Sequence, residues 1–455
     1  MSHGHPLVDI GVLKVRTSLL QRGGGIRYLY LVDFANKVKS KHTGDSTHGL
    51  TVLWGKLESL GLDCILKFFL TYFWMKKEQI EGLEFNGSDN ELTLGVELEL
   101  QVLDADSLLL TPRAAEIIEL CDDKNIVPEF FQSTIEIRSR ICQNAHEAKE
   151  DLKRSIDKIQ LKANQLNLKL ASTGTHPVAD YRERLVTPSK RYHDLIDRNQ
   201  WLIRRMAVYG MHVHVGMKSG DACIRNNFFF IHFLPHILAL SGSSPFWQGM
   251  YTGLSSCRPT TYEALPTAGM PYLVKNWPEF QKLYSFLLKS KAINGMKDLW
   301  WDLRPSPHNG TLELRFCDEP ATLKEALGII AFIHALAHWF RDHEEEWNHS
   351  HTPLKHWIFR ENKWRAIRYG LHAQIVIARN GKTKLLYKDI LDWLKKLEPY
   401  VKELKYGEYL NVLREVIEKG NSSERQYKIF EATHDFKEVI RGNILEFESG
   451  QPVWA

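Results

Sequence analysis

Four short strings of the sequence alternate apolar residues with residues that bind metal ions or phosphate. They are residues 96–100 (Val-Glu-Leu-Glu-Leu), 135–138 (Ile-Glu-Ile-Arg), 211–215 (Met-His-Val-His-Val) and 312–316 (Leu-Glu-Leu-Arg-Phe). Because successive side chains on a strand point to opposite faces, each string is predicted to bury its apolar side chains and present the others on a second face. If the strings pair in one sheet, bound divalent cations would offset the repulsion among the carboxylates on that face.

Glu97 and Glu99 stand on the first of these predicted strands. Their face also holds Gly95 and Gln101, without the lysines or threonines usually mixed into a solvated face. Carboxylates at this spacing suit a divalent cation, and a solvated strand face is the alternative interpretation. Glu136 in the second string adds another carboxylate of the same kind.

His212 and His214 lie on a short predicted strand bounded by Gly210 and Gly216. Two imidazoles on one face of an apolar strand favour a metal site, because neutral imidazole binds metals that also accept carboxylates. Buried, hydrogen-bonded histidines with no metal are the alternative.

Glu313 and Arg315 in the fourth string, with Arg304 before a Pro-Ser-Pro turn, suit phosphoryl chemistry. A metal held by the carboxylate would bind some phosphate oxygens, while a planar guanidinium takes others through two parallel hydrogen bonds. A surface ion pair is the alternative interpretation of Glu313 and Arg315.

Residues 243–253 form a loop rich in aromatic residues and glycine, and it contains Trp247 and Gln248. The loop is either a buried anchor or a substrate loop. In the second case Arg258, a few residues on, is available for a substrate carboxylate.

Composition excludes several classes of protein. The net charge of +4 arises in residues 1 to 74, which hold nine Lys or Arg against five Asp or Glu, so the body gives no charge-based support for binding nucleic acid. The six cysteines are scattered without a Cys-x-x-Cys pair. This pattern predicts that the protein works in the reducing environment of the cytoplasm. The most apolar run, residues 62–74, is interrupted by Asp63 and Lys67 and is too short to span a membrane. No secretory signal peptide is recognised at the N-terminus.

The chain divides into two regions by composition. Residues 1–90 are predicted to be an N-terminal extension without chemistry of its own, either an appended element or sequence upstream of a start at Met75. Residues 91–445 are predicted to form the catalytic domain.

The sequence patterns of residues 91–445 indicate strands over 92–103, about 127–138 and 168–173, and helices from Thr111, over 145–170 and over 322–347. The C-terminal hundred residues are predicted to be mostly helical. Residues 360–371 include Arg365 and Arg368 at helical spacing, which favours a solvated charged face. Strands and helices alternate irregularly, so the fold class is α+β with an antiparallel sheet.

Six motifs together resemble those of the carboxylate–amine ligases of the type 2 glutamate–cysteine ligase family. They are residues 95–99, 133–137, 210–216, 244–249, 300–307 and 310–315, and the resemblance extends over about residues 90 to 445. It implies a glutamine synthetase-like fold, in which helices pack on a curved antiparallel sheet with a concave active-site face. It also implies ATP, Mg²⁺ or Mn²⁺, glutamate and an amine such as cysteine as ligands, and suggests a homodimer.

The resemblance assigns roles to individual residues. The implied metal ligands are Glu97, Glu99, Glu136, His212 and Glu313, with Glu129 as a further candidate whose strand parity differs. The implied catalytic arginines are Arg304 and Arg315, and the substrate-binding candidates are His214, Trp247, Gln248 and Arg258. The implied reaction activates the side-chain carboxylate of glutamate as γ-glutamyl phosphate, from which an amine displaces phosphate.

Two other functions compete with this hypothesis. A metal-dependent hydrolase would also use a His-x-His pair with carboxylates, although binuclear amidohydrolases add histidines on parallel barrel strands, which this sequence does not predict. A non-catalytic protein that binds metal or nucleotide is the second, and the intact chargeable residues of the alternating motifs argue against it.

Overall fold

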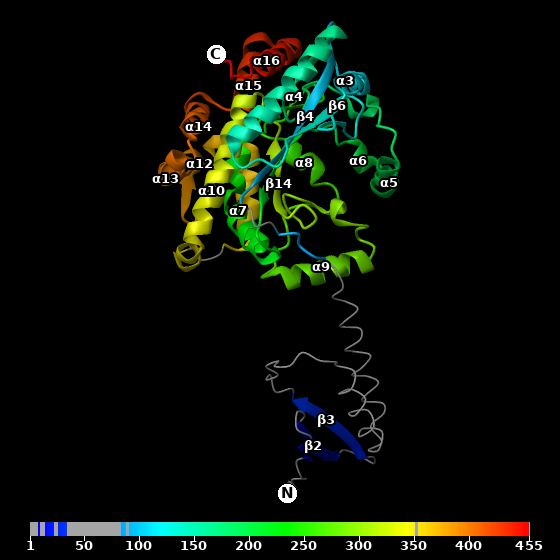
Figure 1. Ribbon diagram of the computed structural model, residues 1–455, viewed down its shortest axis with the longest axis vertical. Coiled ribbons are helices and arrows are strands. Elements are labelled where there is room, and N and C mark those ends of the chain that lie inside the picture. The colour runs from blue at the N-terminus through cyan, green and yellow to red at the C-terminus, as the bar shows by residue number, and fades with distance from the viewer. Residues whose placement is uncertain are drawn as a thin grey trace. The chain divides into compact units, whose positions relative to one another are not determined.

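The computed structural model describes residues 8–9, 14–21, 26–33, 83–87, 91–350 and 354–454. The chain forms two compact units, residues 1–78 and residues 79–455 (Figure 1). In the first unit β1 (Val8–Asp9), β2 (Lys14–Gln21) and β3 (Ile26–Asp33) form an antiparallel sheet in that order. A start at Met75 lies outside the described residues, and the predicted boundary at residue 90 stays a prediction.

The second unit is built on a seven-stranded sheet in the order β13-β14-β8-β4-β6-β5, with β7 also paired to β4. Every pair in this sheet is antiparallel. The strands are β4 (Leu94–Asp104), β5 (Ile126–Pro128), β6 (Thr134–Arg138), β7 (Leu168–Ala171), β8 (Gly210–Gly216), β13 (Leu303–Ser306) and β14 (Thr311–Asp318). The four alternating strings lie on β4, β6, β8 and β14, so they share one antiparallel sheet as predicted.

The single strand predicted over residues 127–138 was wrong. The structure has two antiparallel strands there, β5 and β6, joined by a reversal of the chain. Pro128 has no N–H to continue a strand ladder, and the N–H of Thr134 donates to the carbonyl of Phe131 in a turn. The connecting residues include Glu129, which explains why its strand parity did not match that of Glu136.

The apolar face of the sheet packs against helices α4 (Ala145–Gln165), α7 (Gly220–Ser241) and α10 (Leu323–Ser350). Figure 1 shows α7 and α10 on one side of β4 and β14, and α5 and α6 on the other. The apolar residues of all four strings are at most 2% exposed. Helix α10 is long and apolar enough to cross a membrane, but 83% of its most apolar window is buried inside the structure, which identifies it as a core helix. A capping box begins it as predicted: Thr322 Oγ1 accepts from the N–H of Glu325 at 3.1 Å and donates to its carboxylate.

The remaining described α-helices and strands surround this core. They are α3 (Ala114–Cys121), α5 (Lys190–Asn199), α6 (Trp201–Arg204), β9 (Phe246–Trp247), β10 (Met250–Tyr251), α8 (Arg258–Tyr262), β11 (Ala268–Gly269), α9 (Trp277–Lys289), β12 (Trp300–Trp301), α11 (His356–Tyr369), β15 (Gln374–Val376), β16 (Thr383–Leu385), α12 (Leu386–Lys396), α13 (Glu398–Glu403), α14 (Gly407–Lys419), α15 (Ser422–Thr433) and α16 (Phe436–Ser449). The C-terminal region is mostly helical, as its apolar spacing predicted.

Residues 83–87, which were predicted to lie in the N-terminal extension, belong to the second unit and pack against its other residues. The ring of Phe85 lies edge-on to Trp277 with centroids 5.2 Å apart. The backbone N–H of Asn86 donates to the carbonyl of Pro307 at 2.9 Å, and its side-chain amide donates to the carbonyl of His308 at 3.0 Å. These contacts hold residues 83–87 beside the turn that joins β13 to β14.

Candidate functional site

Strand register brings the chemical residues of the four strings onto one face of the sheet. Glu97 on β4 lies opposite His212 on β8 and Arg138 on β6, and Glu99 lies opposite Glu136. The pairing continues across β8, β14 and β13, where His214 lies opposite Glu313 and Glu313 lies opposite Arg304. Directly paired residues share a face, so carboxylates, imidazoles and guanidiniums are side by side.

These residues line one cavity of about 610 Å³. Nine of the predicted site residues line it: Glu97, Glu99, Glu136, His212, His214, Arg258, Arg304, Glu313 and Arg315. Glu129 lines it as well, with apolar and aromatic walls from Phe130, Ile203, Met206 and Trp300. Leu83, Glu84 and Asn86 also line the cavity, although they lie in the region predicted to have no chemistry of its own.

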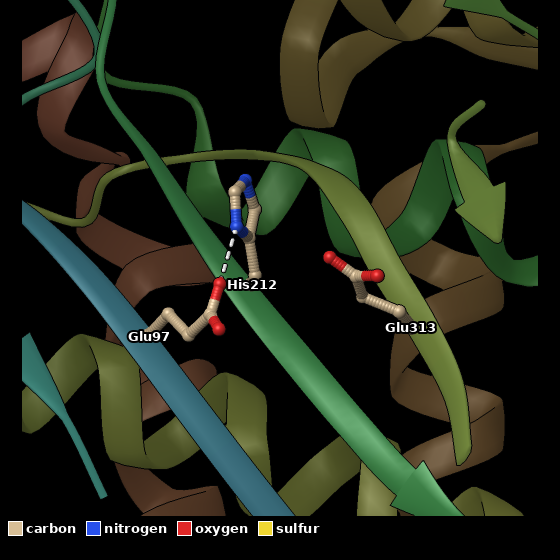
Figure 2. A group of neighbouring side chains, drawn as sticks. All are labelled: Glu97, His212 and Glu313. Carbon is tan, nitrogen blue, oxygen red and sulfur yellow. Dashed lines mark hydrogen bonds and ion pairs between the residues drawn. The ribbon is translucent and has the colours of Figure 1, made fainter. Parts of the chain in front are cut away.

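Glu97, His212 and Glu313 form the centre of the site. Their oxygen and nitrogen ligand atoms all lie within 4.8 Å of one another (Figure 2). His212 Nδ1 lies 3.0 Å from Glu97 Oε2. Burial and the charge of Arg315 lower the pKa of His212 to about 4, so the imidazole is neutral near pH 7. Burial raises the pKa of Glu97, but the hydrogen bond and charge of His212 outweigh it and lower that pKa to about 2. A neutral imidazole beside ionised carboxylates is a donor set for a divalent cation.

His214 lies next to this centre on the same strand. Its Nδ1 is 2.9 Å from Thr311 Oγ1, and its Nε2 is 3.8 Å from both Glu97 Oε1 and Glu313 Oε1. The Thr311 hydroxyl therefore fixes the ring so that Nε2 faces the two carboxylates.

Two arginines converge on Glu313. Arg304 binds its carboxylate with two hydrogen bonds, Nε to Oε2 at 2.9 Å and Nη2 to Oε1 at 3.1 Å, and Arg315 Nη1 also donates to Oε1. Burial would raise the pKa of Glu313, but the charges of Arg304 and Arg315 hold it well below its usual range. Each guanidinium keeps further N–H donors, so the pair can also bind a phosphate at this end of the cavity.

The opposite end of the cavity is acidic. Burial, and then the charge of Glu129, raises the pKa of Glu99 to about 7. Burial with the charges of Glu97 and Glu129 raises the pKa of Glu136 well above its usual range, although Arg138 Nε donates to its carboxylate at 2.5 Å. Buried carboxylates this close cannot all ionise without a compensating charge.

Trp247 and Gln248 are not among the described residues that line the cavity. Trp247 belongs to the β9–β10 hairpin, and the amide of Gln248 donates to Asp180 Oδ1 at 3.0 Å. The start of their loop is a buried anchor, because Asp318 Oδ2 accepts from the N–H of Ser243 at 2.9 Å and the hydroxyl of Ser244 at 2.7 Å. Only Arg258, of the three residues predicted for this region, lies at the cavity.

Sequence reasoning missed several cavity residues. Arg138 was in the second string but was given no role, although its alternation with Glu136 placed both on the same face. Arg191 on α5 and Tyr262 on α8 also line the cavity. The sequence around Arg191 carries no signal for a site, and Tyr262 lies one turn after the predicted residue Arg258 on α8.

The fold of the second unit has counterparts among solved structures. The chain resembles the crystal structure of the glutamate–cysteine ligase of Francisella tularensis in complex with AMP, with a TM-score of 0.59 at 11% identity over 80% of this chain and 90% of that one. It also resembles the bifunctional glutathione synthetase of Pasteurella multocida, with a TM-score of 0.55 at 13% identity over 79% and 52% of the two chains. At these identities the likeness establishes the fold, and the predicted fold class is confirmed.

Sequence comparison identifies the particular family. The model of glutamate–cysteine ligase family 2 matches residues 93–448. The protein named "Putative glutamate–cysteine ligase 2" of Bdellovibrio bacteriovorus is 41% identical over 78% of this chain and 94% of its own length. Its namesake from Thermobifida fusca is 38% identical over 81% and 94%. The chain belongs to glutamate–cysteine ligase family 2 and is a ligase enzyme, as the motifs predicted.

Proposed function

We propose that this ligase uses ATP to activate the side-chain carboxylate of glutamate and joins it to an amine, with cysteine as the first candidate. The main support for this proposal is one face of the cavity. There Glu97, His212 and Glu313 have ligand atoms within 4.8 Å of one another, beside two arginines. A phosphoryl transfer needs this combination of metal ligands and guanidiniums, because little covalent work is left to the protein.

The residues present fit bound divalent cations such as Mg²⁺ or Mn²⁺. Glu97, His212 and Glu313 supply one mixed oxygen and nitrogen donor set. Glu99 and Glu136 lie opposite each other on adjacent strands, with Glu129 close enough for its charge to raise the pKa of both. We assign Glu97, Glu99, Glu136, His212 and Glu313 as metal ligands. A bound cation would neutralise phosphate charge during transfer.

Arg304 and Arg315 hold the transferring phosphoryl group in this proposal. Both guanidiniums already converge on Glu313, which fixes their orientation before substrate binds. An oxygen of the glutamate side chain forms a bond to the γ-phosphorus of ATP as the bond to ADP breaks. The amine then attacks the acyl carbon of γ-glutamyl phosphate, phosphate leaves, and the amine gives up one proton. Preorganised cations stabilise the charge that develops in both steps.

Arg258 is suited to bind a substrate carboxylate. It is 6% exposed and lines the cavity, and its Nε is buried without a hydrogen-bond partner among the described residues. A buried donor without a partner is costly, so a bound carboxylate would satisfy it. His214 faces the same cavity and is the second candidate for substrate contact.

The remaining expectations follow from the family and the composition. A small-molecule ligase needs no nucleic acid or membrane partner, and we place it in the cytoplasm because its cysteines lack any disulfide framework. A homodimer remains a proposal to be tested by light scattering.

An ADP-release screen tests this function. Purified protein is incubated with ATP, Mg²⁺ and glutamate, together with individual amino acids and amines. ADP formation that requires both glutamate and one amine supports the proposal. Cleavage of amides in the absence of ATP would contradict the proposal and would indicate that the protein is a hydrolase.

A further inference from the structure

Four buried or partly buried side chains behind the catalytic cavity form a connected group, here called the Lys363 cluster: Tyr262, Glu263, Asp302 and Lys363. Lys363 on α11 is 3% exposed, and its Nζ donates to Asp302 Oδ2 at 2.5 Å and to Glu263 Oε1. The hydroxyl of Tyr262 donates to Asp302 Oδ1. Asp302 is therefore fully buried, with both carboxylate oxygens occupied.

The Lys363 cluster lies between two cavities. Tyr262 lines the catalytic cavity. Glu263 and Lys363 line a separate cavity of about 820 Å³. The neighbouring residues Trp300 and Trp301 divide in the same way, Trp300 lining the first cavity and Trp301 the second. The cluster is thus part of the wall behind the substrate site, and its cation comes from a helix that contributes no lining residue to that site.

Arg258 is the cavity residue that this wall supports. It stands four residues before Tyr262 on α8, and its guanidinium lies 5.3 Å from the centre of the Tyr262 ring, a cation–π distance. Arg258 Nη1 donates to the carbonyl of Arg315 at 3.2 Å. Asp302 lies beside the same strand, because its carbonyl accepts from the N–H of Arg315 at 2.8 Å.

Stability alone is a weak reason for this arrangement. Removing an ammonium and a carboxylate from water is costly, and well-packed apolar residues often replace a buried ion pair without loss of stability. The ion pair does fix the geometry of this wall. Lys363 holds the Asp302 carboxylate through a hydrogen bond, and Asp302 in turn holds the Tyr262 hydroxyl. The Tyr262 ring, fixed in this way, contacts the Arg258 guanidinium.

We propose that Tyr262, Asp302 and Lys363 are positioning residues that hold the Arg258 guanidinium ready for the carboxylate of the amino-acid substrate. The inference rests on the proposed function, since it takes glutamate as the ligand of Arg258. It assigns specificity for the carboxylate to a network whose cation, Lys363, lies on a helix outside the catalytic sheet.

Tyr262→Phe tests this inference with little risk to folding, because it removes one hydroxyl and keeps the ring. The matched control is Tyr406→Phe. Tyr406 is also fully buried, and its hydroxyl lies 2.7 Å from both the N–H of Ala145 and His334 Nδ1, away from the cavity. We expect Tyr262→Phe to raise the KM for glutamate about 10-fold, the effect of losing one hydrogen bond to a charged group, with kcat and the KM for ATP nearly unchanged. Tyr406→Phe should lower the unfolding midpoint and leave all kinetic constants alone.

A second pair of variants tests the cation itself. Lys363→Met and Arg425→Met each remove a buried cation that faces two carboxylates, since Arg425 binds Glu325 and Glu446 in the helical layer. Both should destabilise the protein, and only Lys363→Met should raise the KM for glutamate. If neither methionine variant folds, the comparison of Tyr262→Phe with Tyr406→Phe alone tests the positioning role.

The outcomes separate this inference from the proposed function. An active wild-type enzyme with an unchanged glutamate KM in Tyr262→Phe overturns the positioning role and leaves the proposed function intact. A wild-type enzyme that neither binds nor uses glutamate overturns both.

Discussion

The two faces of the seven-stranded sheet carry opposite properties on the same strands. On one face Leu98, Ile137, Val213 and Leu314 are at most 2% exposed and pack in the main apolar core. On the other face their immediate neighbours line a cavity with carboxylates, imidazoles and guanidiniums. Residues that stabilise the fold therefore alternate along each strand with residues that line the cavity. Substitutions at adjacent positions can test the two properties separately.

The chemical face is itself divided. At one end two arginines neutralise Glu313 and keep its pKa low. At the other end, where Glu99, Glu129 and Glu136 gather, burial and mutual repulsion raise the pKa of Glu99 and Glu136. The first end suits an anion such as phosphate, and the second suits a cation.

The first prediction removes a side chain at the centre of the site, where we propose that a metal ion binds. Glu97→Gln or His212→Ala should lower the rate of glutamate-dependent ADP formation by about 100-fold or more, as when a group acting on the transition state is lost. Steady-state kinetics measures this directly. The free energy of unfolding should change little, because neither side chain packs in the apolar core. Near wild-type turnover in both variants would remove the metal-ligand assignment.

Leu98→Ala is the matched control on the opposite face of β4. It should cost about 2 to 5 kcal/mol of unfolding free energy through the cavity it leaves, with the KM of the folded enzyme unchanged. Urea denaturation measures the loss.

Arg315→Lys tests the end of the cavity where two arginines converge on Glu313. The substitution keeps the charge but loses the planar fork, so kcat should fall about 10-fold while the KM for glutamate stays nearly constant. An Arg315 that serves only as the ion-pair partner of Glu313 would instead show a small loss of stability and full turnover.

Shortening the chain tests whether residues 83–87 support the chemical face. A chain that begins at Met75 should match the full-length enzyme in activity and stability. A chain that begins at Glu91 loses the contacts of Phe85 and Asn86, which should cost about 2 kcal/mol or more of unfolding free energy and reduce activity. Equal behaviour of the two shortened chains would show that residues 83–87 contribute nothing.

The last prediction concerns the dependence of stability on pH and involves histidines away from the site. Burial lowers the pKa of His176 to about 4 and that of His334 to about 3. The unfolded chain protonates these imidazoles below about pH 6.5 while the folded chain does not, so stability is lost as pH falls from about 6.5 toward 4. Each histidine should contribute a slope of about 1.4 kcal/mol per pH unit in that window. Urea denaturation at pH 7.5, 6.5 and 5.5 should show a shallower loss in His176→Asn than in the wild type, and equal slopes would contradict the assignment.

The alternating strings were enough to predict the sheet and its two faces. Side chains on a strand alternate with a period of two, so Glu97 and Glu99 had to share a face. The antiparallel fold and the family followed from the same motifs. The register that pairs Glu97 with His212 was not in the sequence, because it depends on contacts between strands more than a hundred residues apart.

The sequence did not reveal which helical residues contribute buried charges near the site. Lys363 lies in a stretch whose arginines favoured a solvated charged face, yet its own side chain is 3% exposed and ion-paired. Helical spacing indicates which residues share a face, but the partner of a buried charge comes from another segment. The loop with Trp247 and Gln248 had the composition of a substrate loop, and its composition did not distinguish that role from a buried anchor.

Trapping with hydroxylamine tests whether the enzyme forms γ-glutamyl phosphate. Hydroxylamine replaces the unknown amine, so the assay needs only protein, ATP, Mg²⁺ or Mn²⁺ and glutamate. We expect γ-glutamyl hydroxamate to form in step with ADP, at a rate reduced about 10-fold in Arg315→Lys. If no hydroxamate forms with any metal or carboxylate tested, acyl-phosphate chemistry is not the reaction of this cavity.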